Sequence, residues 1–195
     1  AFLPRGIAPK LAALGSLGAL GLAIYLIADY QAGSGMQHVT DEMWISQLGI
    51  HYKIGLDGLN LFLVALTTLG FAAAIIASNF RDWGEKGSLY YFHLLLAETF
   101  VLGAFLAQDL ALFVVFFDLM LIPFYFIGVT WGLGENRQRA VLKMVIYTFV
   151  GSLLMLAAVI ATGVLATPEG QSISFALSDL RERTLARAPR SGSSC

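Results

Sequence analysis

Four ionisable side chains fall inside long apolar stretches of this sequence: His93, Glu98, Asp118 and Lys143. A carboxylate at the centre of a membrane-spanning helix costs about 2.5–3.5 kcal/mol on insertion scales, so such groups usually face protein or water and move ions or protons. Asp118 is the strongest candidate because it stands deep within the apolar run 110–131. The alternative is a protonated carboxyl that only hydrogen-bonds a neighbouring backbone carbonyl.

Glu98 is predicted to lie at the depth of Asp118. The runs 88–107 and 110–131 form a tight hairpin that turns near Gln108, and each carboxyl is ten residues from that turn. At the helical rise, ten residues span about 15 Å. Two carboxylates at one depth in a medium of low dielectric repel each other, so one can hold a proton near neutral pH, as a proton relay requires. The direction in which Glu98 faces stays open.

Lys143 begins a stripe on the last apolar run. Lys143, Tyr147 and Gly151 recur at i, i+4 and i+8 and would share one helix face. Lys143 lies about one turn inside the membrane. The alternative to a role in proton transfer is therefore that its side chain only extends the ammonium group back to water. His93 is expected at the same depth, and it either takes part in proton transfer or is an ordinary residue of the membrane interface. The resulting hypothesis is a half-channel that leads past His93 and Lys143, by Tyr147 and Tyr125, to Asp118.

Five apolar stretches must position these groups. A hydrocarbon core of about 30 Å needs about 20 helical residues. Of all residues, 57% are hydrophobic and 13% are charged, against about a quarter charged in soluble domains. The sequence therefore predicts an all-α, polytopic transmembrane helix bundle within residues 1–167. The predicted spans are 10–29, 58–80, 88–107, 110–131 and 141–166.

The segments between the spans carry further signals. Asp57 and Asp109 each precede a span, and we interpret them as N-terminal helix caps. Residues 31–56 contain alternating apolar residues and are expected to form an external loop or a short hairpin. Small residues in the first span suit close helix packing, among them Gly15, Gly18 and Gly21.

Cations mark one side of the membrane. Seven Lys and Arg residues fall on the side of residue 1, and only Lys53 falls on the other side. The seven are Arg5, Lys10, Arg81, Lys86, Arg137, Arg139 and Lys143. Short loops rich in Lys and Arg stay in the cytoplasm. The aromatic residues expected at that same interface are Trp83, Tyr90, Tyr91 and Trp131. We therefore predict a multi-pass protein of a bacterial-type inner membrane, with the residue 1 end in the cytoplasm.

Several function classes are disfavoured. The net charge of −1 offers no basic surface for nucleic acid. The single cysteine, Cys195, permits neither a disulfide framework nor clustered metal ligands, and no cofactor is expected in this chain. The start at Ala1 is interpreted as a cut or processed end. Residues 168–195 form a polar tail with four arginines, and a truncation or a reading-frame slip near residue 186 is expected there.

A family resemblance rests on one run of residues. Phe-Phe-Asp-Leu-Met-Leu-Ile-Pro-Phe-Tyr-Phe at 116–126 is followed by Trp131-Gly132 and by Lys-Met-Val-Ile-Tyr-Thr at 143–148. This combination resembles the antiporter-like membrane-arm subunits of respiratory complex I, of the NADH-quinone oxidoreductase chain M or subunit 4 type. The segment Leu-Asp-Gly-Leu-Asn-Leu at 56–61 agrees with it. The resemblance covers the chain to about residue 180 but only the N-terminal portion of the family's length.

The resemblance implies a role for Asp118. It occupies the place of the family's proton-transfer acid on the fifth helix, where the family usually has Glu. The usual partner, a lysine on the seventh helix, is absent from this sequence. The implied function is proton translocation in a redox-driven pump, with NADH, FMN, iron–sulfur clusters and quinone in partner subunits. The alternatives are a subunit of a multisubunit sodium or proton antiporter, and a structural membrane scaffold.

Overall fold

The computed structural model describes residues 7–30, 37–45, 50–81 and 83–166. Five helices in this part of the chain are long and apolar enough to cross a membrane. They lie where the sequence predicts spans, with bounds shifted by at most a few residues, so the prediction of an all-α bundle is confirmed. The five are α1 (Ala8–Asp29), α2 (Gly58–Ser78), α3 (Gly87–Leu106), α4 (Leu110–Trp131) and α5 (Arg137–Ala166). The predicted polar tail at 168–195 lies outside the described residues.

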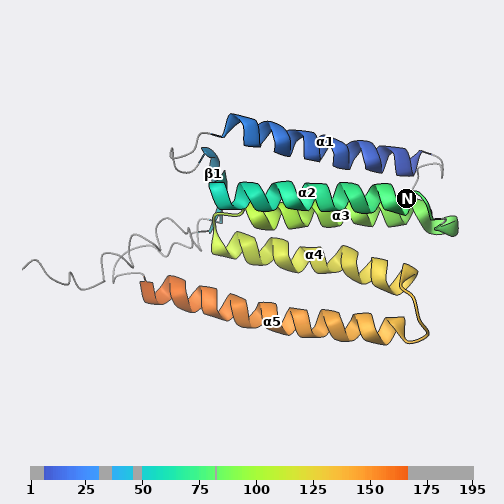
Figure 1. Ribbon diagram of the computed structural model, residues 1–195. Coiled ribbons are helices and arrows are strands. Elements are labelled where there is room, and N and C mark those ends of the chain that lie inside the picture. Colours follow the sequence, from blue (N-terminus) through green and yellow to red (C-terminus); the bar gives the residue numbers. More distant parts are fainter. Residues whose placement is uncertain (1–6, 31–36, 46–49, 82, 167–195) are drawn as a thin grey trace, which may run out of the picture.

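The helices stand side by side, and the longer α5 extends beyond the others at its C-terminal end (Figure 1). α3 packs against α1, α2 and α4, and α5 packs chiefly against α4. Pairs that are adjacent in sequence therefore form antiparallel neighbours. The connections from α2 to α5 are short, whereas residues 30–57, which contain two strands, join α1 to α2. A single 3-10 turn, η1 (Gly84–Lys86), leads into α3.

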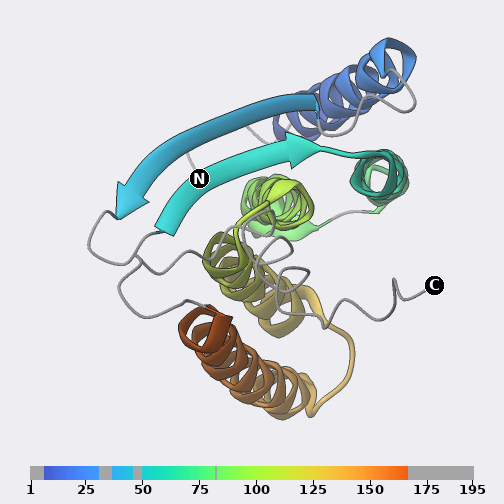
Figure 2. The same ribbon diagram turned by 90° about the vertical axis from the view of Figure 1, so that its left-hand side faces the viewer.

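A β-hairpin covers one end of the bundle (Figure 2). β1 (Gln37–Ile45) pairs antiparallel with β2 (Ile50–Leu56), so the short-hairpin interpretation of 31–56 is confirmed. The Gln108 amide donates to the Lys53 carbonyl at 2.8 Å. Two side chains, Gln108 Nε2 and Asn60 Nδ2, donate to the Gly55 carbonyl at 3.2 and 2.8 Å. These bonds fasten β2 to the α3–α4 turn and to the start of α2.

Both predicted caps are confirmed. Asp57 accepts hydrogen bonds from the amides of Leu59 and Asn60 at 2.9 Å, and Asn60 Oδ1 accepts from the Asp57 amide at 2.7 Å. Asp109, which is fully buried, accepts from the amides of Ala111 and Leu112 at 2.8 and 3.2 Å. Each carboxylate thus satisfies amide groups that a first helical turn leaves unpaired. The two caps define where α2 and α4 begin.

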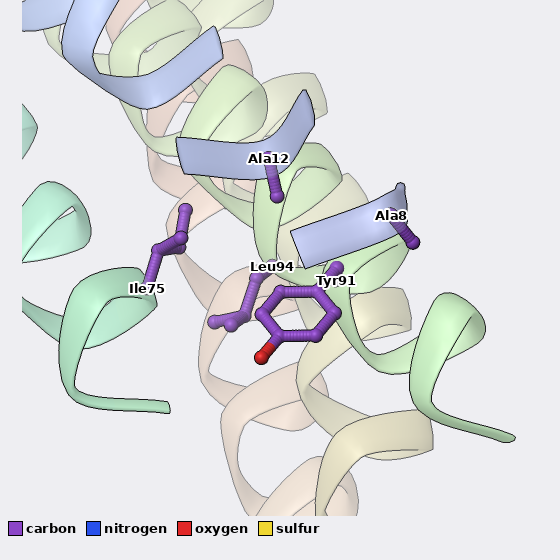
Figure 3. Close-up of a cluster of buried hydrophobic side chains, with 5 residues drawn as sticks. All are labelled: Ala8, Ala12, Ile75, Tyr91 and Leu94. Carbon is purple, nitrogen blue, oxygen red and sulfur yellow. The ribbon is translucent and has the colours of Figure 1, made fainter. Parts of the chain in front are cut away.

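Small residues let α1 approach its neighbours, although two of the predicted glycines do not take part. Ala8, Ala12 and Ser16 repeat every four residues and are buried, and the two alanines pack with Ile75, Tyr91 and Leu94 (Figure 3). The prediction that Gly18 and Gly21 allow close packing of α1 on another helix is wrong for the described bundle. No described atom lies within 4 Å of a Cβ added at either glycine. The alanine and serine stripe points inward, and these glycines lie on the outer face.

Aromatic residues gather at the end of the bundle opposite the hairpin, as predicted. The rings of Trp83 and Tyr90 stack with centroids 3.9 Å apart, and Tyr90 meets Trp131 edge to face at 5.3 Å. Five of the described cations predicted for this side lie within three residues of a helix end: Lys10, Arg81, Lys86, Arg137 and Arg139. Lys143 lies six residues into α5, and Arg5 lies outside the described residues. The aromatic residues and most of these cations thus lie at the same end of the bundle.

Candidate functional site

Asp118 lies within α4, eight residues after its first residue, Leu110. This distance corresponds to about 12 Å along the helix axis. The side chain is partly buried, and its Oδ1 is buried without a hydrogen-bond partner among the described residues. A buried polar atom without a partner is costly, and more so when the group is charged. Asp118 therefore needs a bound proton, a water molecule or a group from outside the described residues.

A cavity of about 490 Å³ opens between α4 and α5 beside Asp118. Tyr125 lines it from one face of α4, two turns beyond Asp118, and α5 contributes Val145 and Phe149. The remaining lining residues are apolar: Leu119, Leu121, Ile122 and Phe126. The space is large enough for several water molecules, and a water needs polar partners such as the Asp118 carboxyl and the Tyr125 hydroxyl. Asp118 and Tyr125 therefore share one site, as the sequence predicts.

Pro123 adds a backbone acceptor to this site. Proline has no amide hydrogen, so the usual helical bond from residue 123 to the carbonyl of Leu119 is absent. Pro123 is buried within α4, and Leu119 lines the cavity. The Leu119 carbonyl is thus freed from its helical bond one residue from Asp118. The sequence analysis did not predict this acceptor, which the i−4 spacing from Pro123 could have indicated.

Glu98 faces a different neighbour. It is only 4% exposed, and the Ser16 hydroxyl of α1 donates to Glu98 Oε1 at 3.2 Å. Glu98 is eight residues from the end of α3, and Asp118 is eight residues from the start of α4, so the helix bounds agree with the predicted common depth. Glu98 does not line the cavity beside Asp118. The structure therefore places the two carboxyl groups toward different helices, and Ser16 is a partner that the sequence did not indicate.

The predicted stripe on α5 does not meet Asp118. Tyr147 is 78% exposed, and Gly151 is exposed with no described atom within 4 Å of an added Cβ. Lys143 is exposed too and lines a separate hollow with Asn136, Arg139 and Ala140. α5 instead presents Val145 and Phe149 to Asp118. The prediction that Tyr147 lines the path to Asp118 is wrong for this arrangement of α4 and α5.

His93 lies against α4 near the aromatic end of the bundle. Its Nδ1 is 2.7 Å from the Leu89 carbonyl, so Nδ1–H donates in that bond and Nε2 is left as the second polar atom. The ring centroid is 5.2 Å from that of Phe126 and 6.4 Å from that of Trp131. Phe126 also lines the Asp118 cavity. His93 and Asp118 therefore have one neighbour in common but do not line one cavity.

Comparison with known proteins identifies the fold that carries this site. Residues 107–177 match the family described as NADH:quinone oxidoreductase/Mrp antiporter, transmembrane, and that stretch includes Asp118. NADH-quinone oxidoreductase subunit M of Rhodobacter capsulatus is 38% identical over 146 residues, which are 74% of this chain and 28% of that protein. The resemblance to the antiporter-like membrane subunits is confirmed. This antiporter-like chain is thus a multi-pass membrane protein related to subunits of a respiratory complex.

Further relatives extend the comparison. F(420)H(2) dehydrogenase subunit M of Methanosarcina mazei is 35% identical over 73% of this chain and 29% of that protein. The chloroplastic NAD(P)H-quinone oxidoreductase chain 4 of Mesostigma viride is 32% identical over 84% of this chain and 32% of that protein. A chain of respiratory complex I from Thermus thermophilus superposes with a TM-score of 0.72 at 32% identity. The match covers 88% of this antiporter-like chain and 35% of that chain, so the chain spans about a third of its relatives' length.

Proposed function

We propose that this chain translocates protons as a membrane-arm subunit of an NADH:quinone oxidoreductase, and that the Asp118 carboxyl carries the proton. The observation that supports this most is the buried Oδ1, which has no hydrogen-bond partner among the described residues and borders a cavity. A carboxyl that needed only to be stable would bond a neighbouring carbonyl. An unpartnered oxygen beside a cavity is suited to exchange a proton with water.

The cavity supports a short relay. The carboxylate of Asp118 accepts a proton from a hydronium ion, which becomes water, and later releases the proton to a second water, which becomes hydronium, so charge and atoms balance at each transfer. The Tyr125 hydroxyl and the Leu119 carbonyl supply hydrogen bonds that hold such waters. The negative charge left after release requires a nearby cation or dipole in a medium of low dielectric. We propose that this counter-charge comes from a helix outside the described residues.

We propose that Glu98 and Lys143 take part in proton transfer at positions away from Asp118. Glu98 is a second carboxyl at the same depth, bonded to Ser16 on the α1 side, and it would store a proton apart from Asp118. Lys143 lies six residues into α5 and is exposed, so it would act near the water-facing end rather than beside Asp118. The proposed orientation puts the residue 1 end in the cytoplasm of a bacterial-type inner membrane, because six cations of the described chain gather there.

Redox chemistry belongs to other subunits in this proposal. The relatives are named for different electron donors, NADH in one and F(420)H(2) in another, although both resemble this chain. Because similar membrane subunits occur with different electron donors, we infer that the donor binds to another subunit. We therefore assign NADH, FMN, iron–sulfur clusters and quinone to partner subunits and no cofactor to this chain.

The experiment compares Asp118→Asn with Asp118→Glu in the assembled complex in sealed inverted membrane vesicles. NADH-driven acidification of the vesicle interior is measured together with NADH oxidation. We expect Asp118→Asn to lower the number of protons moved per NADH while oxidation in the presence of an uncoupler stays at the parental rate. Asp118→Glu, which restores the usual residue of the family, should pump like the parent. An unchanged proton ratio in the Asn variant would refute the proposal.

A second candidate function is a subunit of a multisubunit sodium or proton antiporter, because the description of the matched family includes the Mrp antiporter. It predicts sodium-dependent proton exchange in vesicles without any electron donor. A structural scaffold predicts no change in transport when Asp118 is neutralised. The two assays together separate the three functions.

A further inference from the structure

A hollow with a polar rim lies at the aromatic end of the bundle, away from the Asp118 cavity. Its volume is about 370 Å³, and it opens where α1 begins, α2 ends and α3 begins. Lys10 lines it from α1, Asn79 and Arg81 line it from the end of α2, and Trp83 and Tyr91 complete the side toward α3. None of these residues takes part in the proposed proton relay.

Two of the described lining residues are cations. Lys10 and Arg81 bring two cations, and no carboxylate is among the described residues that line the hollow. The Arg81 guanidinium lies 4.8 Å from the centroid of the Trp83 ring, a cation–π contact that orients the charge without neutralising it. Guanidinium presents a planar fork of N–H donors that matches phosphate oxygens. The rim is therefore suited to an anionic group with several oxygen atoms.

Asn79 adds a further donor to the lining of the hollow. The Tyr91 hydroxyl donates to Asn79 Oδ1 at 2.9 Å, so the remaining polar group of the Asn79 side chain is its NH₂, a donor. The Tyr91 ring is buried and packs with Ala8 and Ala12 in a cluster of apolar side chains (Figure 3). Tyr91 thus links the polar lining of the hollow to a packed apolar cluster.

Apolar surface continues from this rim into the membrane. Leu14 lies one turn beyond Lys10, and Ile76 lies one turn before Asn79, on the same helix faces. Both side chains are exposed, Leu14 by 67% and Ile76 by 43%. A molecule with a phosphate in the hollow would find room for hydrocarbon chains directly below it.

We propose that this hollow binds the phosphate of an anionic phospholipid headgroup. It lies at the ends of spanning helices, beside the stack of Trp83 and Tyr90, and such aromatic rings mark the level of lipid headgroups. Basic pockets between transmembrane helices are known to hold anionic headgroups. A zwitterionic lipid carries its own cation, so two cations at the rim favour an anionic lipid. The inference does not depend on the proposed proton function.

The test uses the full chain in nanodiscs of phosphatidylcholine that contain brominated phosphatidylglycerol or, for comparison, brominated phosphatidylcholine. Bromine quenches nearby tryptophan fluorescence, and the difference from a Trp83→Phe variant isolates the Trp83 signal. We expect phosphatidylglycerol to quench Trp83 more strongly at equal mole fraction. Removal of both charges in Lys10→Gln/Arg81→Gln should reduce the preference by about fivefold per charge.

Matched variants decide what the preference means. Arg139→Gln removes one cation from the same end of the bundle, at the separate hollow on α5, and should keep the preference. Lys10→Arg retains both charges and leaves the Arg81 guanidinium on the Trp83 ring, so it should also keep the preference. An unchanged preference in the double Gln variant would overturn the proposal, as would its loss in either control. Abolition of the preference by millimolar inorganic phosphate would show a site for a free anion and would overturn the lipid assignment.

Discussion

The contact between Gly128 on α4 and Val141 on α5 sets how closely these helices approach beside the Asp118 cavity. A Cβ added at Gly128 would lie 2.7 Å from Val141 Cγ2 and 3.3 Å from Cγ1. Ordinary contacts begin at 3.4 Å, so Gly128→Ala requires the neighbour to move by about 0.7 Å. Valine in a helix is held in one strongly preferred rotamer, so the shift falls on the backbone of α5. Val145 and Phe149 follow Val141 on the same face and would move with it.

We expect Gly128→Ala to destabilise the bundle. Overpacking of this kind costs about 1–3 kcal/mol, while replacement of a helical glycine by alanine returns up to about 1 kcal/mol. Gly70→Ala on α2 is the matched control, because no described atom lies within 4 Å of its added Cβ; it should be neutral or stabilising. The free energy of unfolding is measured by circular dichroism during titration of mixed micelles with sodium dodecyl sulfate.

The double variant Gly128→Ala/Val141→Ala tests the cause. Alanine at 141 removes both Cγ atoms, and the remaining Cβ lies 3.6 Å from the added methyl, an ordinary contact. The cycle of single and double variants should therefore give a coupling energy of about 1–3 kcal/mol in favour of the pair. A coupling energy below about 0.5 kcal/mol, within the scatter of independent sites, would refute this account of the α4–α5 approach.

Three further predictions follow from the packing. Asp57→Ala should lower the free energy of unfolding by about 1 kcal/mol, whereas Asp57→Asn should keep most of it because asparagine also caps helices; the detergent titration distinguishes them. Gly103→Ala should destabilise by about 1–3 kcal/mol, since its Cβ would lie 2.6 Å from the Phe116 ring, and Phe116→Leu should relieve the loss in the same assay. Ser16→Ala should cost about 1–3 kcal/mol by removing the donor to buried Glu98, whereas Glu98→Gln, whose amide oxygen still accepts, should cost less in thermal unfolding.

Length and composition were sufficient to predict the five spans, because a bilayer requires about 20 apolar residues in any crossing helix. Local chemistry predicted the caps at Asp57 and Asp109 for a similar reason, since a cap depends only on its own first turn. The depth of Asp118 and Glu98 also followed from counting along a tight hairpin. All of these depend on neighbours in sequence.

The direction in which each helix face points could not be predicted. In lipid, both the outer and the inner face of a helix are apolar, so hydrophobic periodicity did not show that Glu98 contacts Ser16. For the same reason the periodic stripe of Lys143 and Tyr147 suggested a path to Asp118 that the packing of α4 on α5 does not form. Val145 and Phe149 meet Asp118 instead, and only the arrangement of the two helices shows this.

The proposal that Asp118 exchanges a proton is tested most directly by infrared difference spectroscopy of the assembled complex, between the resting state and turnover with NADH. A carboxyl that gains or loses a proton changes its C=O stretching band, and the band shifts in heavy water. We expect Asp118→Asn to remove one such band and Glu98→Gln to leave that band in place. A spectrum that is unchanged in the Asp118→Asn variant would contradict the central claim.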